Sequence, residues 1–197
     1  MLFRSGLVGL LTPESAASST DPVLLLEAAE DGWWYSAPLP GGAMVAAYMT
    51  DEDAVAGGAE ELWRHKLCAA IYTAARIEGF RLDALRVRAA ATGRLDAVTG
   101  PAWIAVGDAA TAYDPLSAAG ICKALDSGVK AAGAIQETLA GNVGAFHEYS
   151  AAVAREFAEY LEQRAHFYRR ETRWPHSPFW QRRQTAESSV NAIQGVG

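Results

Sequence analysis

The first half of the chain alternates between short apolar runs and turn residues, which is the pattern of an antiparallel sheet. Apolar runs at residues 23–29, 33–39 and 44–49 predict three strands. An Asp-Gly pair at 31–32 predicts a hairpin between the first two, and the Pro-Gly-Gly run at 40–42 predicts a turn before the third. Because short turns join successive strands, the pattern predicts a β-meander.

Helical periodicity replaces this pattern in three later places. Apolar residues recur at helical spacing over residues 60–78, 121–140 and 145–173. Gly141 directly follows the second of these helices, as is common at a helix end. The third predicted helix has an apolar stripe opposite a polar side, and we place Arg164 on the polar side.

One stretch joins the two patterns and carries the candidate chemistry. Residues 103–106 form an apolar run after a Gly-Pro pair, which predicts a short buried strand. Gly107 is expected to let the backbone approach another group closely, and Asp108 places a carboxylate at the end of the strand. Asp114 and the proline after it then predict a turn.

A long alanine-rich helix is predicted to begin at Gly120. The N–H groups at the start of a helix favour negative charge, and the carboxylate of Asp108 can accept hydrogen bonds from sugar hydroxyls. The stretch therefore suits a ligand that has both hydroxyls and phosphates. The alternative is an ordinary strand-to-helix turn with a capping aspartate.

Composition narrows the functional classes. The 197 residues are half hydrophobic, which indicates a globular protein large enough to bury a core, and the net charge of -6 gives no support to a nucleic-acid partner. We expect no membrane span, since no apolar run is long enough. Cys68 and Cys122 are too far apart to form a disulfide framework, so a reducing compartment such as the cytoplasm is the simpler expectation. The four histidines lack ligand spacing, and no metal site is expected.

The residues 107–110, 114–117 and 120–121 also resemble the second FAD-binding motif of the flavoprotein monooxygenase group. This resemblance implies an α/β (α+β) fragment, a partial Rossmann-like flavoprotein fold with an antiparallel substrate-domain sheet and long C-terminal helices. It implies FAD as the cofactor, with its ribityl chain on Asp108. The cofactor-binding residues that it implies are Gly107, Asp108, Asp114, Pro115, Ser117, Gly120 and Ile121.

A second resemblance lies in the predicted sheet. Residues 32–38, Gly-Trp-Trp-Tyr-Ser-Ala-Pro, partly match the Gly-Trp-x-Trp-x-Ile-Pro signature of flavin-dependent halogenases, with Tyr35 in place of the second tryptophan. Trp33, Trp34 and Tyr35 are therefore candidates for the wall of a substrate chamber, and filling the core is the alternative. Tryptophan halogenases have a glutamate where this chain has Ser117, which argues against halogenation.

Over most of its length the chain resembles a halogenase-like branch that includes the maturation flavoproteins of tryptophylquinone enzymes. This implies the C-terminal part of an FAD-dependent oxidoreductase, a monooxygenase or hydroxylase. Its substrate would be a small aromatic molecule or a tryptophan of a partner protein. The alternatives are a flavin-dependent halogenase, a geranylgeranyl-reductase-like enzyme, and a non-catalytic fragment or subunit unable to bind FAD alone.

The predicted organisation has three parts. Residues 1–100 are the remainder of a substrate-binding domain, 101–140 the second half of an FAD-binding domain, and 141–197 a C-terminal helix and tail. The chain has no Gly-x-Gly-x-x-Gly turn, so we expect a missing N-terminal half that carries it.

The start of the chain is the least typical part. Residues 1–5 can be back-translated into the end of a widely used sequencing adapter, which predicts adapter read-through joined to a truncated gene. A chance match and a genuine split subunit are the alternatives. Residues 6–20 are then expected to be the tail of an incomplete segment, rich in turn and loop residues.

Overall fold

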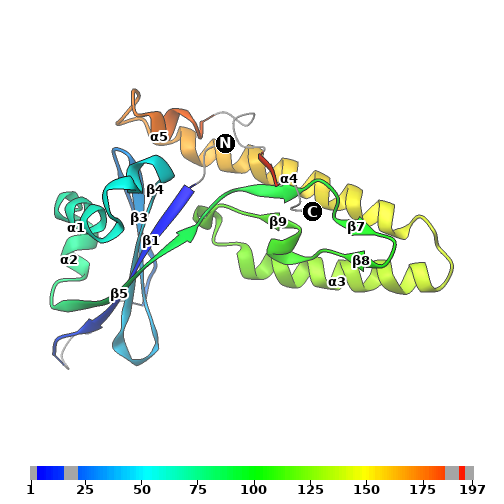
Figure 1. Ribbon diagram of the computed structural model, residues 1–197, viewed down its shortest axis with the longest axis horizontal. Coiled ribbons are helices and arrows are strands. Elements are labelled where there is room, and N and C mark those ends of the chain that lie inside the picture. Colours follow the sequence, from blue (N-terminus) through cyan, green and yellow to red (C-terminus); the bar gives the residue numbers. More distant parts are fainter. Residues whose placement is uncertain (1–3, 16–21, 185–190, 194–197) are drawn as a thin grey trace. The chain divides into compact units, whose positions relative to one another are not determined.

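The structure is a computed structural model that describes residues 4–15, 22–184 and 191–193. The chain divides into two compact units, and Figure 1 labels elements of both. Unit 1 contains the described residues up to Ala90 together with Glu171–Gln181, and unit 2 contains Ala91–Arg170 and the described residues from Arg182 onward. The three-part division at residues 100 and 140 concerns roles rather than packing, and it stays a prediction.

Unit 1 is built on a five-stranded antiparallel sheet with the strand order β2-β3-β4-β1-β5. The predicted meander is confirmed, because β2, β3 and β4 are successive neighbours in this order. The strands are β1 (Arg4–Pro13), β2 (Leu25–Ala29), β3 (Gly32–Pro38), β4 (Met44–Asp51) and β5 (Phe80–Ala89).

The strand β1 corrects the expectation for residues 6–20. It pairs with β4 on one side and β5 on the other, so it is an interior strand and not a loop-rich tail. Leu7 and Leu11 are buried in the core. A Cβ added to Gly9 would lie 2.9 Å from the ring of Trp63, so this glycine makes room for a helix to pack on the strand. The origin of residues 1–5 stays a prediction, and residues 1–3 and 16–21 lie outside the described residues.

The core of unit 1 is centred on three aromatic rings. Trp34 on β3 lies 4.9 Å from Tyr48 on β4 and 5.4 Å from Trp63, measured between ring centroids. Trp63 is the buried residue of α1 (Ala59–Ala69), and its indole N–H donates to the carbonyl of Ala46 at 3.2 Å. Not every apolar residue at helical spacing in this region is buried, since Cys68 and Tyr72 are both exposed.

A distant carboxylate breaks the helix predicted over residues 60–78. The helix α1 ends at Ala69, and α2 begins again at Tyr72 and runs to Arg76. Glu27 of β2 accepts hydrogen bonds from the N–H groups of residues 71, 72 and 73, at 2.7, 3.1 and 2.7 Å. Burial alone would raise the pKa of Glu27, but these hydrogen bonds outweigh it and hold the pKa below the usual value.

The C-terminal part of unit 1 is a short aromatic segment. Trp174 and Trp180 stack with their ring centroids 6.2 Å apart, the second of them in α5 (Pro178–Gln181). The indole N–H of Trp180 donates to the carbonyl of Ala29 at 3.0 Å. The segment is therefore docked at the end of β2.

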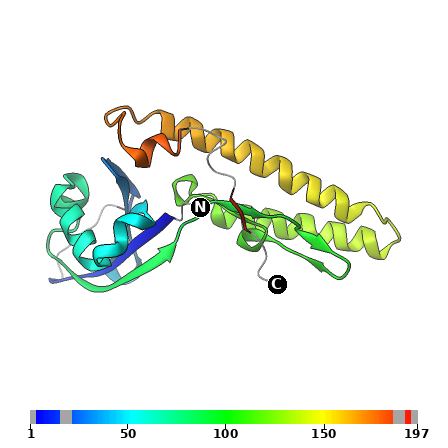
Figure 2. The same ribbon diagram turned by 45° about the horizontal axis from the view of Figure 1, so that its top comes forward.

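Unit 2 is dominated by two long helices, α3 (Gly120–Leu139) and α4 (Ala145–Arg169), which lie side by side in Figures 1 and 2. The prediction of both helices is confirmed. Gly141 ends α3 with φ +101, and its N–H donates to the carbonyl of Thr138 at 3.0 Å. Five short strands accompany the helices: β6 (Gly93–Leu95), β7 (Thr99–Gly100), β8 (Trp103–Ile104), β9 (Thr111–Ala112) and β10 (Asn191–Ile193).

The predicted buried strand at residues 103–106 is shorter and more open than expected. Only Trp103 and Ile104 form β8, which pairs with β7 across a tight turn, and the side chain of Trp103 is exposed. Within the described residues, β8 has no strand on its other edge. Ile104 and Ala105 are partly buried against the core of unit 2, whereas Trp103 and Val106 are exposed.

Candidate functional site

Two single-turn helices precede α3, and each carries or follows an aspartate. The first turn is Gly107–Ala109, with Asp108 at its centre. The second turn is Pro115–Ser117, with Asp114 as its N-terminal cap. All seven residues that the sequence nominates for cofactor binding lie on these turns or at the start of α3, within unit 2.

In the first turn, the carboxylate of Asp108 faces solvent beside the start of α3. Its side chain is 80% exposed, and the ammonium of Lys123 donates to one of its oxygens at 2.7 Å. Lys123 lies near the N-terminal end of α3, but its side chain points inward. Its nitrogen is also bonded to the carbonyl of Thr111 and lies 4.5 Å from the ring centre of Tyr113. Asp108 is thus fixed in place while most of its surface remains open to a ligand.

Gly107 lets the backbone of the first turn pack closely against α3. Its φ is +57, a conformation that favours glycine, and an added Cβ would lie 3.2 Å from the Cβ of Ala124. Its N–H donates to the hydroxyl of Ser127 at 2.8 Å. These contacts seat the first turn directly on the helix.

The N-terminal end of α3 is open. Gly120, Ile121 and Cys122 are exposed, and nothing lies within 4 Å of where a Cβ on Gly120 would be. The first N–H groups of an α-helix have no partner within the helix, and they carry its positive dipole end. Asp108 and the helix start together present a hydrogen-bond acceptor and anion-binding donors on one surface.

In the second turn, the carboxylate of Asp114 is turned inward and is only 1% exposed. One of its oxygens accepts from the guanidinium of Arg164 at 3.0 Å and from the hydroxyl of Tyr168 at 2.8 Å. The other accepts from the N–H of Leu116 at 3.1 Å. The polar position predicted for Arg164 is therefore wrong, since this residue is buried in α4 against Asp114.

The backbone of Asp114 is held by α4 as well. Its N–H donates to the hydroxyl of Tyr160 at 2.6 Å. Burial, reinforced by the nearby charge of Asp114, raises the pKa of Tyr160, so the phenol stays neutral. Asp114 thus uses its side chain and its N–H to attach the second turn to α4.

The rest of this loop is ordered by its own hydrogen bonds. The hydroxyl of Ser117 donates to the carbonyl of Asp114 at 2.9 Å and accepts from the N–H of Ala119 at 3.3 Å. Ala118 has φ +49, a left-handed conformation that is costly for a residue with a Cβ. Cofactor contacts by Pro115 and Ser117 stay predictions.

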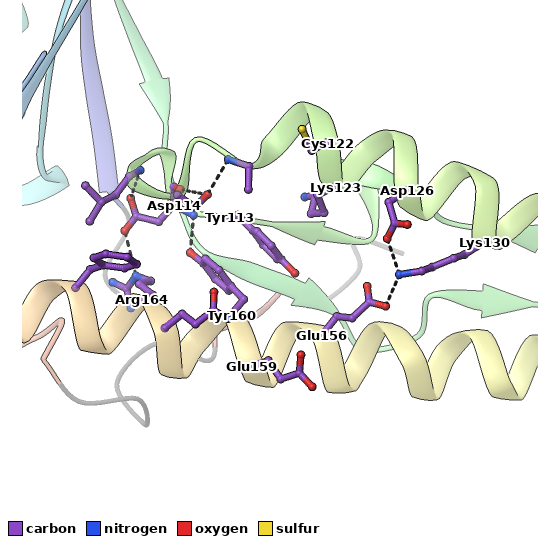
Figure 3. A pocket seen from close by; sticks show the side chains of 15 residues that line it. Tyr113, Asp114, Cys122, Lys123, Asp126, Lys130, Glu156, Glu159, Tyr160 and Arg164 are labelled. Carbon is purple, nitrogen blue, oxygen red and sulfur yellow. Dashed lines mark hydrogen bonds and ion pairs between the residues drawn. The ribbon is translucent and has the colours of Figure 1, made fainter. Parts of the chain in front are cut away.

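A cavity of about 500 Å³ lies between α3, α4 and the second turn (Figure 3). Tyr113 and Tyr160 stack in parallel on its wall, with ring centroids 3.8 Å apart. Burial, followed by the charge of Glu156, raises the pKa of Tyr113 to about 12. At the other end, Lys130 bridges Asp126 at 2.5 Å and Glu156 at 2.6 Å, and both partners raise its pKa above the ordinary value.

The aromatic candidates of β3 belong to unit 1, whereas the residues nominated for cofactor binding belong to unit 2. Trp34 is in the core beside Tyr48 and Trp63, as the core alternative expects. Trp33 is buried and Tyr35 half-buried, and both point to the face opposite Trp34 because side chains alternate along a strand. A role for these three residues in a chamber wall stays a prediction.

Sequence reasoning placed Arg164 on the wrong side of α4. Arg164 and Tyr168 fall at the spacing of the buried residues Phe157 and Leu161, so the signal was an arginine on the apolar stripe. A buried arginine needs a paired acid, so this signal predicts an acidic partner without identifying it as Asp114.

Residues 4–15, 22–184 and 191–193 contain no group of three or more histidine, cysteine, aspartate or glutamate residues placed to hold a metal ion. None of their helices is long and apolar enough to cross a membrane.

Solved structures with this fold include flavin-dependent halogenases and hydroxylases. The peptidyl tryptophan dihydroxylase QhpG, essential for tryptophylquinone cofactor biogenesis, aligns with a TM-score of 0.82 and 23% identity over 100% of this chain and 46% of its own. The myxobacterial chondrochloren halogenase CndH, an FAD-dependent halogenase, aligns with a TM-score of 0.79 and 20% identity over 92% of this chain and 44% of its own. At these identities the likeness establishes the fold.

A curated relative agrees with this class. LodB of Marinomonas mediterranea, described as an FAD-dependent oxidoreductase, is 31% identical over 172 residues. The match covers 85% of this chain but 46% of LodB, so the chain spans about half the length of this relative. No family model matches the chain.

The predicted resemblance to halogenase-like FAD-dependent oxidoreductases is therefore confirmed. The expected mixed architecture, with an antiparallel sheet and long C-terminal helices, is confirmed with it. The relatives are enzymes, and FAD is the cofactor named for LodB and CndH.

Proposed function

We propose that this chain is part of an FAD-dependent oxidoreductase and supplies the surface that binds the ribityl chain and pyrophosphate of FAD. One observation carries the proposal: the exposed carboxylate of Asp108 lies beside the open start of α3. Ribityl hydroxyls can donate to the carboxylate, while the pyrophosphate suits the N–H groups of a helix start. The open space at Gly120 would let the cofactor approach the backbone closely.

The roles of the two aspartates differ in this proposal. Asp108 binds the cofactor directly, with Lys123 holding its carboxylate in place. Asp114 is occupied by Arg164 and Tyr168, so it acts by fixing the loop that leads to Gly120 and Ile121. These residues bind and orient, and the bound FAD would supply the oxygen-activating chemistry.

The reaction that we propose is hydroxylation of an aromatic substrate, either a small molecule or a tryptophan within a partner protein. The likeness to the tryptophan dihydroxylase QhpG supports this choice over halogenation. The hydroxyl of Ser117, at the position of the halogenase glutamate, is committed to the hydrogen bonds of its own loop.

The proposed partner within the whole enzyme is a half that carries the Gly-x-Gly-x-x-Gly turn. One face of α3 supports this, because Ile121, Leu125, Val129 and Leu139 are between 68% and 84% exposed. An uncharged helix face of this kind is normally covered by another part of the protein. LodB has about as much chain again outside the matched region. The cytoplasm remains the proposed location.

The experiment compares flavin retention in two proteins, this chain alone and this chain joined to its upstream coding sequence. Visible flavin absorbance of the purified proteins is the readout. We expect colour in the joined protein and little in the chain alone. A colourless joined protein would overturn the FAD proposal, and a strongly coloured chain alone would overturn the need for a second half.

The joined protein can then be used for a substrate test. Oxygen incorporation into a free indole or a tryptophan-containing peptide would be followed by mass spectrometry. A gain of one or two oxygen atoms is the expected outcome. Incorporation of halide in place of oxygen would favour the halogenase alternative.

A further inference from the structure

We propose that Arg164 is a positioning residue for FAD, acting through the buried Asp114 on the loop that leads into α3. The inference rests on the proposed function, because it concerns the same cofactor site. It assigns to α4 a part in holding the cofactor loop, although no residue of α4 belongs to the predicted FAD motif.

The contacts form a continuous path from α4 to the start of α3. Arg164 donates to one oxygen of Asp114 at 3.0 Å, and the other oxygen accepts from the N–H of Leu116 at 3.1 Å. Ser117 continues the path, because it donates to the carbonyl of Asp114 and accepts from the N–H of Ala119. Gly120, the first residue of α3, follows directly.

The chemistry of the pair favours a positioning role. Burying two opposite charges costs much of what their attraction gains, so such a pair contributes little net stability compared with neutral residues of similar volume. Its directional hydrogen bonds do fix geometry. Both oxygens of Asp114 have partners, and the guanidinium of Arg164 also lies 4.9 Å from the ring centre of Tyr168.

The loop needs such an anchor because one of its residues is in a costly conformation. Ala118 is left-handed, with φ +49, two residues before α3 begins. A left-handed alanine persists only where its surroundings hold it in place. The attachment of Asp114 to α4 lies just before this residue and restrains the loop from that side.

The test replaces both charges, which avoids leaving one charge buried alone. The double variant Asp114→Asn/Arg164→Gln keeps an acceptor for the N–H of Leu116 but loses the ion pair. The matched control is Lys130→Gln/Glu156→Gln, which removes another ion pair between α3 and α4, one that does not touch the loop. Arg164→Lys serves as the conservative variant, because it keeps the positive charge and loses the guanidinium geometry.

Two readouts separate positioning from simple stability. The first is amide hydrogen exchange at residues 116–118 in the unliganded chain, compared with the midpoint of thermal unfolding. We expect exchange at these residues to be at least ~10-fold faster in the double variant, with a much smaller change in the midpoint. Arg164→Lys should be intermediate, and the control should match the wild type.

The second readout is the dissociation constant and visible circular dichroism of bound FAD, measured in the protein that retains flavin. The double variant should bind FAD at least ~10-fold more weakly and with an altered spectrum. Wild-type exchange together with a wild-type spectrum would overturn the inference. A double variant that fails to fold, combined with an Arg164→Lys protein identical to wild type, would overturn it as well.

These outcomes are distinct from failure of the proposed function. If the wild-type protein binds no FAD in any form, the proposed function fails, while the exchange data still report whether Arg164 positions the loop. If the wild-type protein binds FAD and the variants bind it unchanged, only the positioning role fails.

Discussion

The first and second turns before α3 are a few residues apart, but their aspartates are in opposite environments. Asp108 is 80% exposed, with a single ion pair to Lys123, whereas Asp114 is 1% exposed with partners on α4 and in its own loop. Both residues belong to one sequence motif. The comparison teaches that an open carboxylate is available to a ligand, while a buried and fully bonded one holds the backbone.

The largest expected effect on stability comes from removing the ion partner of the buried carboxylate of Asp114. Arg164→Met should lower the free energy of unfolding by about 3–5 kcal/mol, because it leaves the carboxylate of Asp114 buried without its ion partner. Lys123→Met is the corresponding change at the first turn and should cost less, because the carboxylate that it leaves unpaired is exposed to water, so the loss comes from the bond to Thr111 and the contact with Tyr113. Urea unfolding followed by circular dichroism measures both. Equal losses would show that the two carboxylates are in similar environments after all.

The next prediction concerns the backbone of the first turn. Gly107→Ala should destabilise the protein by about 1–2 kcal/mol, because its φ of +57 is unfavourable for alanine and the new Cβ would lie 3.2 Å from Ala124. Chemical denaturation measures the loss. A neutral result would mean that the seating of the first turn on α3 is looser than these distances indicate.

In unit 1 a third carboxylate, that of Glu27, is a case between the open Asp108 and the buried Asp114. Glu27 accepts from three N–H groups at the start of α2, which makes it an internal stand-in for an anion at a helix start. Its pKa is lowered, so its stabilising contribution is complete above the unfolded-state value near 4.5 and is lost as the pH falls through the folded-state value. Glu27→Gln should cost about 1 kcal/mol at neutral pH, with the difference shrinking in acid. Thermal unfolding from about pH 3 to about pH 7, a range that brackets the ordinary pKa of a glutamate, measures it. A pH-independent difference would contradict this account.

The smallest expected effect is at the second turn. Ala118→Gly relieves the strain of φ +49, but glycine loses more backbone entropy on folding, so the net stabilisation should be at most about 1 kcal/mol. Differential scanning calorimetry can resolve the shift. Destabilisation would mean that the methyl group of Ala118 makes contacts worth more than the strain.

Local signals in the sequence were enough for much of the fold. The meander of β2, β3 and β4 was predictable because its turns have short-range residue preferences, and α3 and α4 were predictable from their long apolar periodicity. The strand β1 was missed because glycines interrupt its apolar run and its partners on β4 and β5 are distant in sequence.

The features that sequence reasoning missed depend on distant partners. The break between α1 and α2 is set by Glu27, 44 residues before Ile71. The burial of Arg164 depends on Asp114, 50 residues earlier, and nothing near Arg164 in sequence indicates that partner. The location of Asp108 beside the start of α3 was predictable, because a strand, a turn and a helix succeed one another locally. The opposite orientation of Asp114 was not.

The most direct test of the central claim is a titration of the flavin-retaining protein with FAD, comparing wild type, Asp108→Asn and the control Asp96→Asn at another exposed aspartate of unit 2. We expect Asp108→Asn to weaken FAD binding by at least ~10-fold, as expected for loss of hydrogen bonds to a charged acceptor, without changing unfolding. Asp96→Asn should bind as wild type does. Unchanged affinity in Asp108→Asn would contradict the claim that the open carboxylate of the first turn holds the cofactor.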